Sequence, residues 1–199
     1  MTIVLTGDSI TDAGRDRSDL ASRGSGYAAL VGEALPGERV VNTGISGNRV
    51  TDLQARWDDD VLAHSPAVLS IMIGINDTWR RYDSDDPTST ESYALGYRDI
   101  VMRAQAAGVA RIILVEPFLL PVREEQWSWR EDLDPKIQAV RRLASDLGTQ
   151  YLATDGPFAQ RAAALGPAGA SSLAHDGVHP TPEGHRFIAD LWLARYRAA

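Results

Sequence analysis

The sequence contains no cysteine among its 199 residues. This absence excludes disulfide frameworks, thiolate metal sites and cysteine nucleophiles, so any chemistry must use oxygen, nitrogen or imidazole groups. Acidic residues outnumber basic ones by 27 to 20, which gives a formal net charge of −7. No block of lysine or arginine forms the basic stripe that phosphate-backbone binding needs, and we therefore expect no nucleic-acid partner.

Long apolar runs and leader-like segments are also missing. No stretch approaches the ~18 apolar residues of a membrane span, and the amino terminus enters a strand-like segment without the basic and apolar regions of an export signal. We therefore expect a cytoplasmic protein without a membrane partner. Neither Gly-x-Gly-x-x-Gly nor the Gly-x-x-x-x-Gly-Lys-Ser/Thr motif occurs, which counts against a nucleotide-binding domain.

The composition that remains fits one α/β domain over residues 1–199, because 44% apolar residues suffice to bury a core without disulfides or a metal. Apolar strand-like segments alternate with segments of helical spacing. We expect strands at residues 2–6, 39–42, 67–73, 111–115 and 150–154. We expect helices at residues 27–35, 52–62, 89–107, 134–147, 157–165 and 182–196, a polar loop at 80–87 and irregular chain at 118–132. This alternation predicts a flavodoxin-like three-layer sandwich in which helices flank a five-stranded parallel sheet.

Polar clusters follow the first three predicted strands. They are Gly7-Asp8-Ser9, the segment from Asn42 to Asn48, and Gly74-Ile75-Asn76-Asp77. The carboxyl ends of parallel strands meet at one edge of a sheet, where open α/β proteins keep their active sites. Ser9 at that edge is a candidate nucleophile, provided that a base and an oxyanion hole lie nearby.

The base that a serine nucleophile needs is usually an imidazole. His64 sits at a helix end and His185 inside the last predicted helix, where capping, packing or exposure are the simpler roles. His179 follows Asp176 by three residues, directly before the last predicted helix. A compact turn would let that carboxylate orient one ring nitrogen while the other faces Ser9. The alternative is an ordinary loop aspartate beside an exposed loop histidine.

An oxyanion hole needs donors aimed at the charge of a tetrahedral intermediate. The candidates are the backbone amides of Ser9 and Gly47 and the side-chain amide of Asn76. Gly47 suits this role because a residue without Cβ lets a substrate approach its N–H. Turn glycines and a loop-holding asparagine are the alternatives.

A metal centre is the main chemical rival, because His175, Asp176, His179 and His185 lie close in sequence. Such a centre leaves Ser9 and Asn76 unexplained, and we expect neither a metal nor an organic cofactor. A non-catalytic domain that binds a small ligand is the remaining alternative.

Four blocks in chain order resemble those of the SGNH, or GDSL, hydrolase family. They are Gly7-Asp8-Ser9-Ile10-Thr11, Gly44-Ile45-Ser46-Gly47-Asn48, Gly74-Ile75-Asn76-Asp77 and Asp176-Gly177-Val178-His179. The resemblance implies a single SGNH hydrolase domain with Ser9 as nucleophile and oxyanion donor. It implies that Asn76 and Gly47 complete the oxyanion hole, with Gly44 as the alternative glycine. It also makes His179 the general acid and base and Asp176 its orienting carboxylate.

Within that family, the segments Gly44–Val50 and Ile73–Arg80 look like those of the intracellular acetyl-xylan esterases, which deacetylate xylo-oligosaccharides. This resemblance implies a serine esterase acting on a small ester substrate such as an acetylated sugar. A broader lipase-like or thioesterase-like acylhydrolase is the alternative. We expect substrate contacts from Asp8, Trp79 and Arg80. Trp127 or Trp129 could bind a sugar face or mark an interface of a homo-oligomer.

Overall fold

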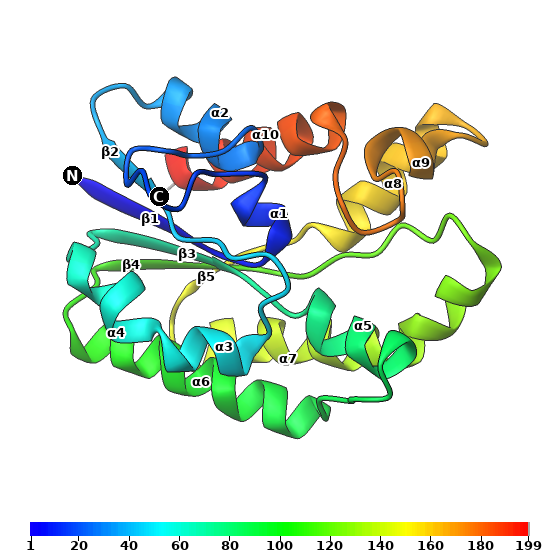
Figure 1. Ribbon diagram of the computed structural model, residues 1–199, viewed down its shortest axis with the longest axis horizontal. Helices are drawn as coiled ribbons and strands as arrows, with labels where there is room; N and C mark the ends of the chain where they lie inside the picture. Colours follow the sequence, from blue (N-terminus) through cyan, green and yellow to red (C-terminus); the bar gives the residue numbers. More distant parts are fainter. Residues whose placement is uncertain (199) are drawn as a thin grey trace.

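The computed structural model describes residues 1–198, and within them a parallel sheet has the strand order β2-β1-β3-β4-β5 (Figure 1). The strands are β1 (Thr2–Gly7), β2 (Arg39–Asn42), β3 (Val68–Met72), β4 (Arg111–Val115) and β5 (Gln150–Leu152). All neighbouring pairs are parallel. The predicted five-stranded parallel sheet with flanking helices is confirmed.

The central strands are apolar on both faces because each face is covered by helices. Ile3 and Leu5 of β1 belong to one core cluster, and Val4 between them belongs to the other. In β4, Ile113 and Leu114 divide in the same way. Successive side chains of a strand point to opposite faces, so two separate cores form from one sheet.

One face of the sheet carries α1 (Ser9–Asp12), α2 (Tyr27–Ala34), α8 (Asp155–Leu165), α9 (Gly169–Leu173) and α10 (Pro182–Arg197). Trp192 of α10 is fully buried, and its indole N–H donates to the hydroxyl of Ser70 in β3 at 2.9 Å. This bond fixes the last helix against the middle of the sheet.

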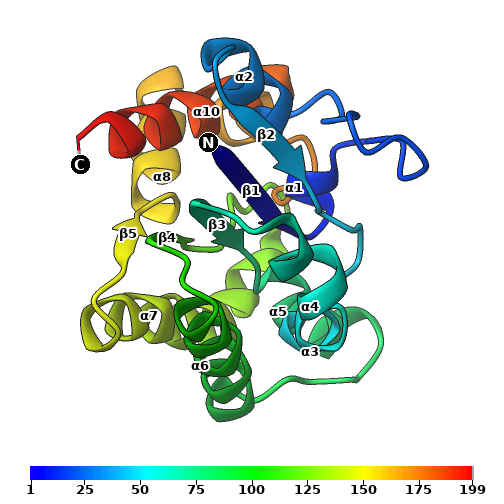
Figure 2. The same ribbon diagram turned by 90° about the vertical axis from the view of Figure 1, so that its left-hand side faces the viewer.

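The other face carries α3 (Val50–Ala55), α4 (Trp57–Asp60), α5 (Ile75–Asp83), α6 (Thr90–Ala106) and α7 (Arg130–Asp146). Figure 2 shows α6 and α7 across the sheet from α2 and α10. Tyr93 and Tyr97 of α6 are buried and donate to the carbonyl oxygens of Ile73 and Ile71. No helix within residues 1–198 has the length and apolarity to cross a membrane.

Some local expectations are wrong. The polar loop expected at 80–87 begins inside α5, because Ile75 and Trp79, four residues apart, pack against the core while charged side chains face outward. The helix expected at 52–62 is divided into α3, α4 and the 3₁₀ turn η1 (Leu62–His64). The break lies at Arg56, whose guanidinium turns toward the carbonyl oxygens of Thr43 and Gly7.

The chain expected to be irregular at 118–132 contains the 3₁₀ turn η2 (Glu124–Trp129), and α7 begins at Arg130, before the expected start. Pro135 lies inside α7 and removes one backbone donor. The apolar side chains Leu133, Ile137 and Val140 are buried on one face of this helix. Their burial outweighs the cost of the missing hydrogen bond. The segment before Ala174 contains the short helix α9.

Candidate active site

Ser9 stands at the carboxyl end of β1, as the first residue of α1. The side chain of Asp8 caps this helix by accepting a hydrogen bond from the backbone amide of Ile10 at 3.0 Å. Gly7 is required just before, because a Cβ there would lie 2.1 Å from the carbonyl oxygen of Met72 in β3. The close pairing of β1 with β3 and the cap together fix the direction of the serine.

Ser9, His179 and Asp176 form a hydrogen-bonded chain. The Oγ of Ser9 lies 2.9 Å from Nε2 of His179, and Nδ1 of His179 lies 2.6 Å from Oδ2 of Asp176. The other carboxylate oxygen accepts from the backbone amides of Val178 and His179 at 2.9 and 2.7 Å. The structure thus forms the compact turn that the Asp-x-x-His spacing predicts. This geometry lets the imidazole accept the serine proton while the carboxylate fixes its tautomer.

The loop that carries His179 is held from outside by the segment after β4. The buried side chain of Gln126 donates to the carbonyl oxygen of Asp176 at 2.7 Å. The amide of Leu120 donates to the carbonyl oxygen of Gly177 at 2.9 Å. Gly177 has φ 89°, and a Cβ there would lie 2.6 Å from the carbonyl oxygen of Leu120. Sequence reasoning missed Gln126, because nothing local distinguishes it from an exposed glutamine.

The charges of Asp176 and His179 support each other. The hydrogen bond that His179 donates to Asp176 raises the pKa of His179 above its usual range and outweighs partial burial, which lowers it. Burial works against ionisation of Asp176, but hydrogen bonds from the His179 side chain and from two backbone amides outweigh it and hold its pKa well below the usual range. Asp176 therefore remains a carboxylate that stabilises an imidazolium.

Asn76 and Gly47 come from the segments that follow β3 and β2. Asn76 lies in the first turn of α5, and its side-chain amide donates to the carbonyl oxygen of Asn48 at 3.0 Å. An amide nitrogen carries two hydrogens, so one remains for a substrate. Gly47 is exposed, has φ 84°, and a Cβ there would meet nothing within 4 Å. Gly44 is buried, and a Cβ there would lie 2.4 Å from the amide nitrogen of Asp12, which favours Gly47 as the accessible donor.

A buried carboxylate ties these two segments together. Asp77, beside Asn76, accepts from the amide of Val50 at 3.2 Å. Burial raises the pKa of Asp77 to about 6, against that hydrogen bond and the nearby charges of Lys136 and Arg49. Lys136 is the only lysine of the chain, is fully buried, and pairs with Asp132. The sequence signal for this anchor was a lone lysine between two apolar residues, Leu133 and Ile137, which are buried in the structure.

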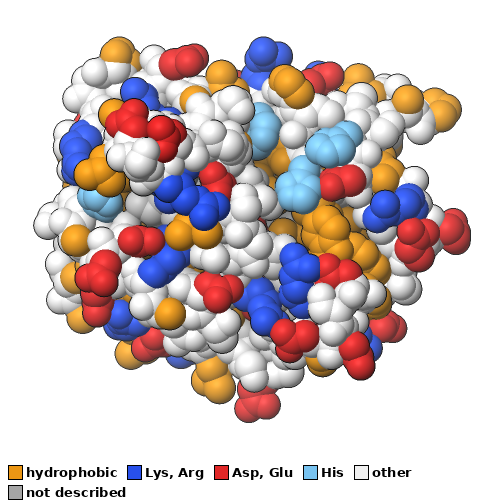
Figure 3. Space-filling view, viewed as in Figure 1, with side chains coloured by type: hydrophobic (Ala, Val, Ile, Leu, Met, Phe, Trp, Pro, Cys, Tyr) orange, Lys and Arg blue, Asp and Glu red, His pale blue; other side chains and the backbone are white. Residues whose placement is uncertain are grey.

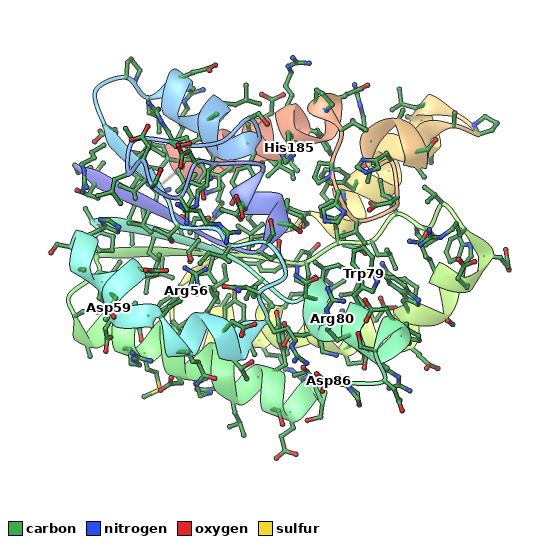
Figure 4. All side chains as sticks on the ribbon, viewed as in Figure 1. Arg56, Asp59, Trp79, Arg80, Asp86 and His185 are labelled. Atoms are coloured by element: carbon green, nitrogen blue, oxygen red, sulfur yellow. The ribbon has the colours of Figure 1, made fainter. Side chains whose placement is uncertain are left out.

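Arg56 is a second anchor that sequence reasoning did not single out as functional. Its guanidinium donates to the carbonyl oxygen of Thr43 and to Oδ1 of Asn48, both at 2.8 Å, and to the carbonyl oxygen of Gly7 at 3.3 Å. Figure 4 shows Arg56 beneath the sheet edge, away from Trp79 and Arg80 of α5. One side chain thus joins the ends of β1 and β2 to the glycine turn.

The residues expected to contact substrate are placed differently from one another. The ring of Trp79 lies 5.7 Å from that of His179, so it borders the reacting atoms. Arg80 follows it in α5, packs its guanidinium over the Trp79 ring and pairs with Asp83. Asp8 is only 1% exposed and caps α1, so it offers no surface to a substrate. Burial raises the pKa of Asp8 to about 7.

The two candidate tryptophan platforms also differ. Trp129 is 5% exposed and stacks on Tyr82 with ring centres 5.3 Å apart, so its faces are occupied by the protein. Trp127 is 60% exposed and borders a cavity of about 330 Å³ with Arg130 and Asp155. In the space-filling view, histidine side chains adjoin an apolar patch beside a hollow of the surface (Figure 3).

Of the remaining histidines, His185 packs between α10 and α2, where its Nδ1 accepts from the amide of Tyr27 at 3.2 Å. Burial lowers the pKa of His185 to about 4. His64 ends η1, as its position before Ser65-Pro66 suggested. His175 is exposed next to Asp176, and its ring lies 6.2 Å from that of His179.

Known proteins share this architecture. Residues 5–187 match the GDSL-like lipase/acylhydrolase family. A curated acetylxylan esterase of Geobacillus stearothermophilus is 37% identical over 96% of this chain and 91% of its own length. The crystal structure of the Geobacillus stearothermophilus acetylxylan esterase Axe2 superposes with a TM-score of 0.87 at 36% identity, covering 98% of this chain and 93% of that one. LAE5, an α/β hydrolase enzyme from the metagenome of Lake Arreo in Spain, gives the same TM-score and identity and is covered to 94%.

The chain therefore belongs to the GDSL-like lipase/acylhydrolase family, and it is a carboxylic ester hydrolase. The structures called catalytic mutants of Axe2 replace a serine, an aspartate and a histidine, the last two three positions apart. Asp176 and His179 have the same spacing here.

Proposed function

We propose that this esterase removes acetyl groups from acetylated xylo-oligosaccharides or similar sugars. The observation that carries the proposal is the hydrogen-bonded chain Ser9–His179–Asp176. Asn76 and the exposed Gly47 are the proposed donors of the oxyanion hole. Similarity to a protein described as an acetyl-xylooligosaccharide esterase, at 36% identity over 98% of this chain, supports the choice of substrate.

In the proposed reaction, His179 takes the proton of Ser9 as its oxygen attacks the ester carbonyl. The oxyanion that forms is held by the amides of Ser9 and Gly47 and the side-chain amide of Asn76. His179 then donates its proton to the leaving sugar oxygen, and an acyl-enzyme remains. A water molecule, deprotonated by the same imidazole, attacks the acyl carbonyl and releases acetate and free Ser9.

The surroundings of the serine favour a short acyl group. The Trp79 ring stands 5.7 Å from the His179 ring and is held by Trp129 behind it, with ring centres 5.5 Å apart. Trp129 in turn stacks on Tyr82. A wall of mutually packed aromatic rings leaves little freedom to admit a long chain, whereas an acetyl group needs little space.

The decisive experiment compares kcat/KM across two sets of substrates. Nitrophenyl esters of increasing acyl length test the acyl site, and acetylated xylo-oligosaccharides beside other acetylated sugars test the alcohol site. We expect acetate to be the best acyl group and acetylated xylo-oligosaccharides the best alcohol. A preference for long acyl chains would overturn the proposal in favour of a lipase-like or thioesterase-like acylhydrolase.

A further inference from the structure

A group of metal-ligating side chains lies at the catalytic loop, and one of its members, His175, has no part in the proposed esterase reaction. His175, Asp176 and His179 each offer a ligand atom, and these atoms all lie within 4.8 Å of one another. Two imidazoles and one carboxylate form a donor set typical of Zn²⁺, whereas Mg²⁺ and Ca²⁺ prefer oxygen ligands.

The distances between these ligand atoms are within an ångström of those between two ligands of one zinc ion. Nε2 of His175 lies 4.0 Å from Oδ2 of Asp176, and Nδ1 of His179 lies 2.6 Å from the same oxygen. Two ligands of a tetrahedral zinc ion stand about 3.4 Å apart, given metal–ligand bonds near 2.1 Å. The side chain of His175 is 66% exposed, so its ring can rotate to close the first distance. The distance between Nδ1 of His179 and Oδ2 of Asp176 must lengthen by less than an ångström as the ion enters.

We propose that His175, Asp176 and His179 form an inhibitory site for Zn²⁺. The ion replaces the proton between Nδ1 of His179 and Asp176, and that proton leaves to solvent. To stay neutral, the imidazole takes up a proton from solvent on Nε2, the nitrogen that lies 2.9 Å from Oγ of Ser9. A protonated Nε2 has no lone pair to accept the serine proton, so zinc binding and ester hydrolysis exclude each other.

His175 distinguishes this site from a bare catalytic pair. A Zn²⁺ held by Asp176 and His179 alone would have only two protein ligands, fewer than the three usual for a zinc site with an open position. His175 supplies the third, and water can fill the fourth. The side chain makes no hydrogen bond to Ser9 or Asn76 among the contacts of residues 1–198, so removing it spares the esterase apparatus.

The test is a zinc titration of chelator-treated enzyme, with hydrolysis of nitrophenyl acetate as the readout and enzyme-free blanks. We expect Zn²⁺ to inhibit, Mg²⁺ to have no effect, and the chelator EDTA to restore full turnover. His175→Ala should keep the basal rate and raise the half-inhibiting zinc concentration roughly tenfold or more, because one of three ligands is lost. His64→Ala, which removes a histidine outside the cluster, is the matched control and should behave as wild type.

Calorimetric zinc binding gives a readout that does not depend on activity. Ser9→Ala protein should bind one ion per chain, and the double variant Ser9→Ala/His175→Ala should lose most of that affinity. The proposal fails if His175→Ala is inhibited at the same zinc concentration as wild type. It also fails if calorimetry finds equal zinc binding with and without His175.

Discussion

The two helical layers contribute to the active site in different ways. The layer of α1 and α10 supplies Ser9 and, from the loop before α10, His179, and these two side chains contact each other directly through a hydrogen bond. The segments that lead into α3 and α5 hold the proposed oxyanion donors, which make no hydrogen bond to Ser9 or His179 within residues 1–198. Buried anchors such as Asp77 and Arg56 fix these segments. Proton transfer needs atoms in contact, whereas an oxyanion hole needs an empty space of fixed shape.

The first prediction removes the nucleophile from the layer of direct contacts. Ser9→Ala should lower kcat by about 10⁴-fold or more, because no other group can form the acyl-enzyme. Circular dichroism and thermal unfolding should match wild type, since Ser9 is not part of either core cluster. Labelling by an organophosphonate should be lost with the activity. A variant that retains turnover would remove Ser9 from the mechanism.

The second prediction changes the partner of the base. Asp176→Asn should lower kcat about 10³- to 10⁴-fold, because the amide no longer fixes the productive tautomer of His179. His179 must be neutral to act as base, so activity rises with pH through its pKa. Asp176 raises that pKa, and the acid limb of kcat/KM in the variant should therefore move to lower pH. An unmoved limb would show that another group controls it.

The third prediction concerns the other layer. Asn76→Ala should slow kcat by about 10²- to 10³-fold, since losing one oxyanion donor costs about 3 to 4 kcal/mol of barrier. The loss should fall mainly on kcat, because the donor acts on charge that develops after binding. Steady-state kinetics with nitrophenyl acetate separate the two constants. An unchanged kcat would exclude Asn76 from the hole.

The fourth prediction tests the anchor beneath the oxyanion donors. Asp77→Ala should reduce kcat roughly tenfold, because the hydrogen bond to Val50 that holds the glycine turn is worth about 1 to 3 kcal/mol. Asp77→Asn is the matched control, since its amide oxygen can still accept from Val50. Activity near wild type in this control would assign the effect to the hydrogen bond. Equal losses in both variants would assign it to the charge beside Lys136.

Sequence reasoning worked best where the signal was local. Asp176 and His179 are three residues apart, so one turn can bring them together; the spacing suggested their contact, and the resemblance to the four family blocks selected it over an ordinary loop pair. The polar clusters after the first strands also came out at one edge, because parallel strands share their direction. Reasoning failed where long-range packing decided, as with Trp129, which is covered by Tyr82 and Trp79 instead of being open to a sugar.

The buried anchors show the same limit. Asp8 looked like a residue beside the nucleophile that could contact substrate, yet it is enclosed and caps α1. Gln126 and Arg56 reach carbonyl oxygens of segments about fifty residues away in the chain. The residues next to Gln126 and Arg56 in the sequence form no pattern that marks these roles, so only the fold shows which segments the two side chains hold.

The sequence by itself determined the sheet and pointed to the candidate reacting groups, because apolar periodicity and short motifs depend on neighbouring residues. The tertiary structure alone decided how the groups are held: which glycine stands free, which carboxylate is enclosed and which tryptophan is exposed. Those properties depend on atoms brought from distant parts of the chain, since burial and electrostatic environment are set by three-dimensional packing.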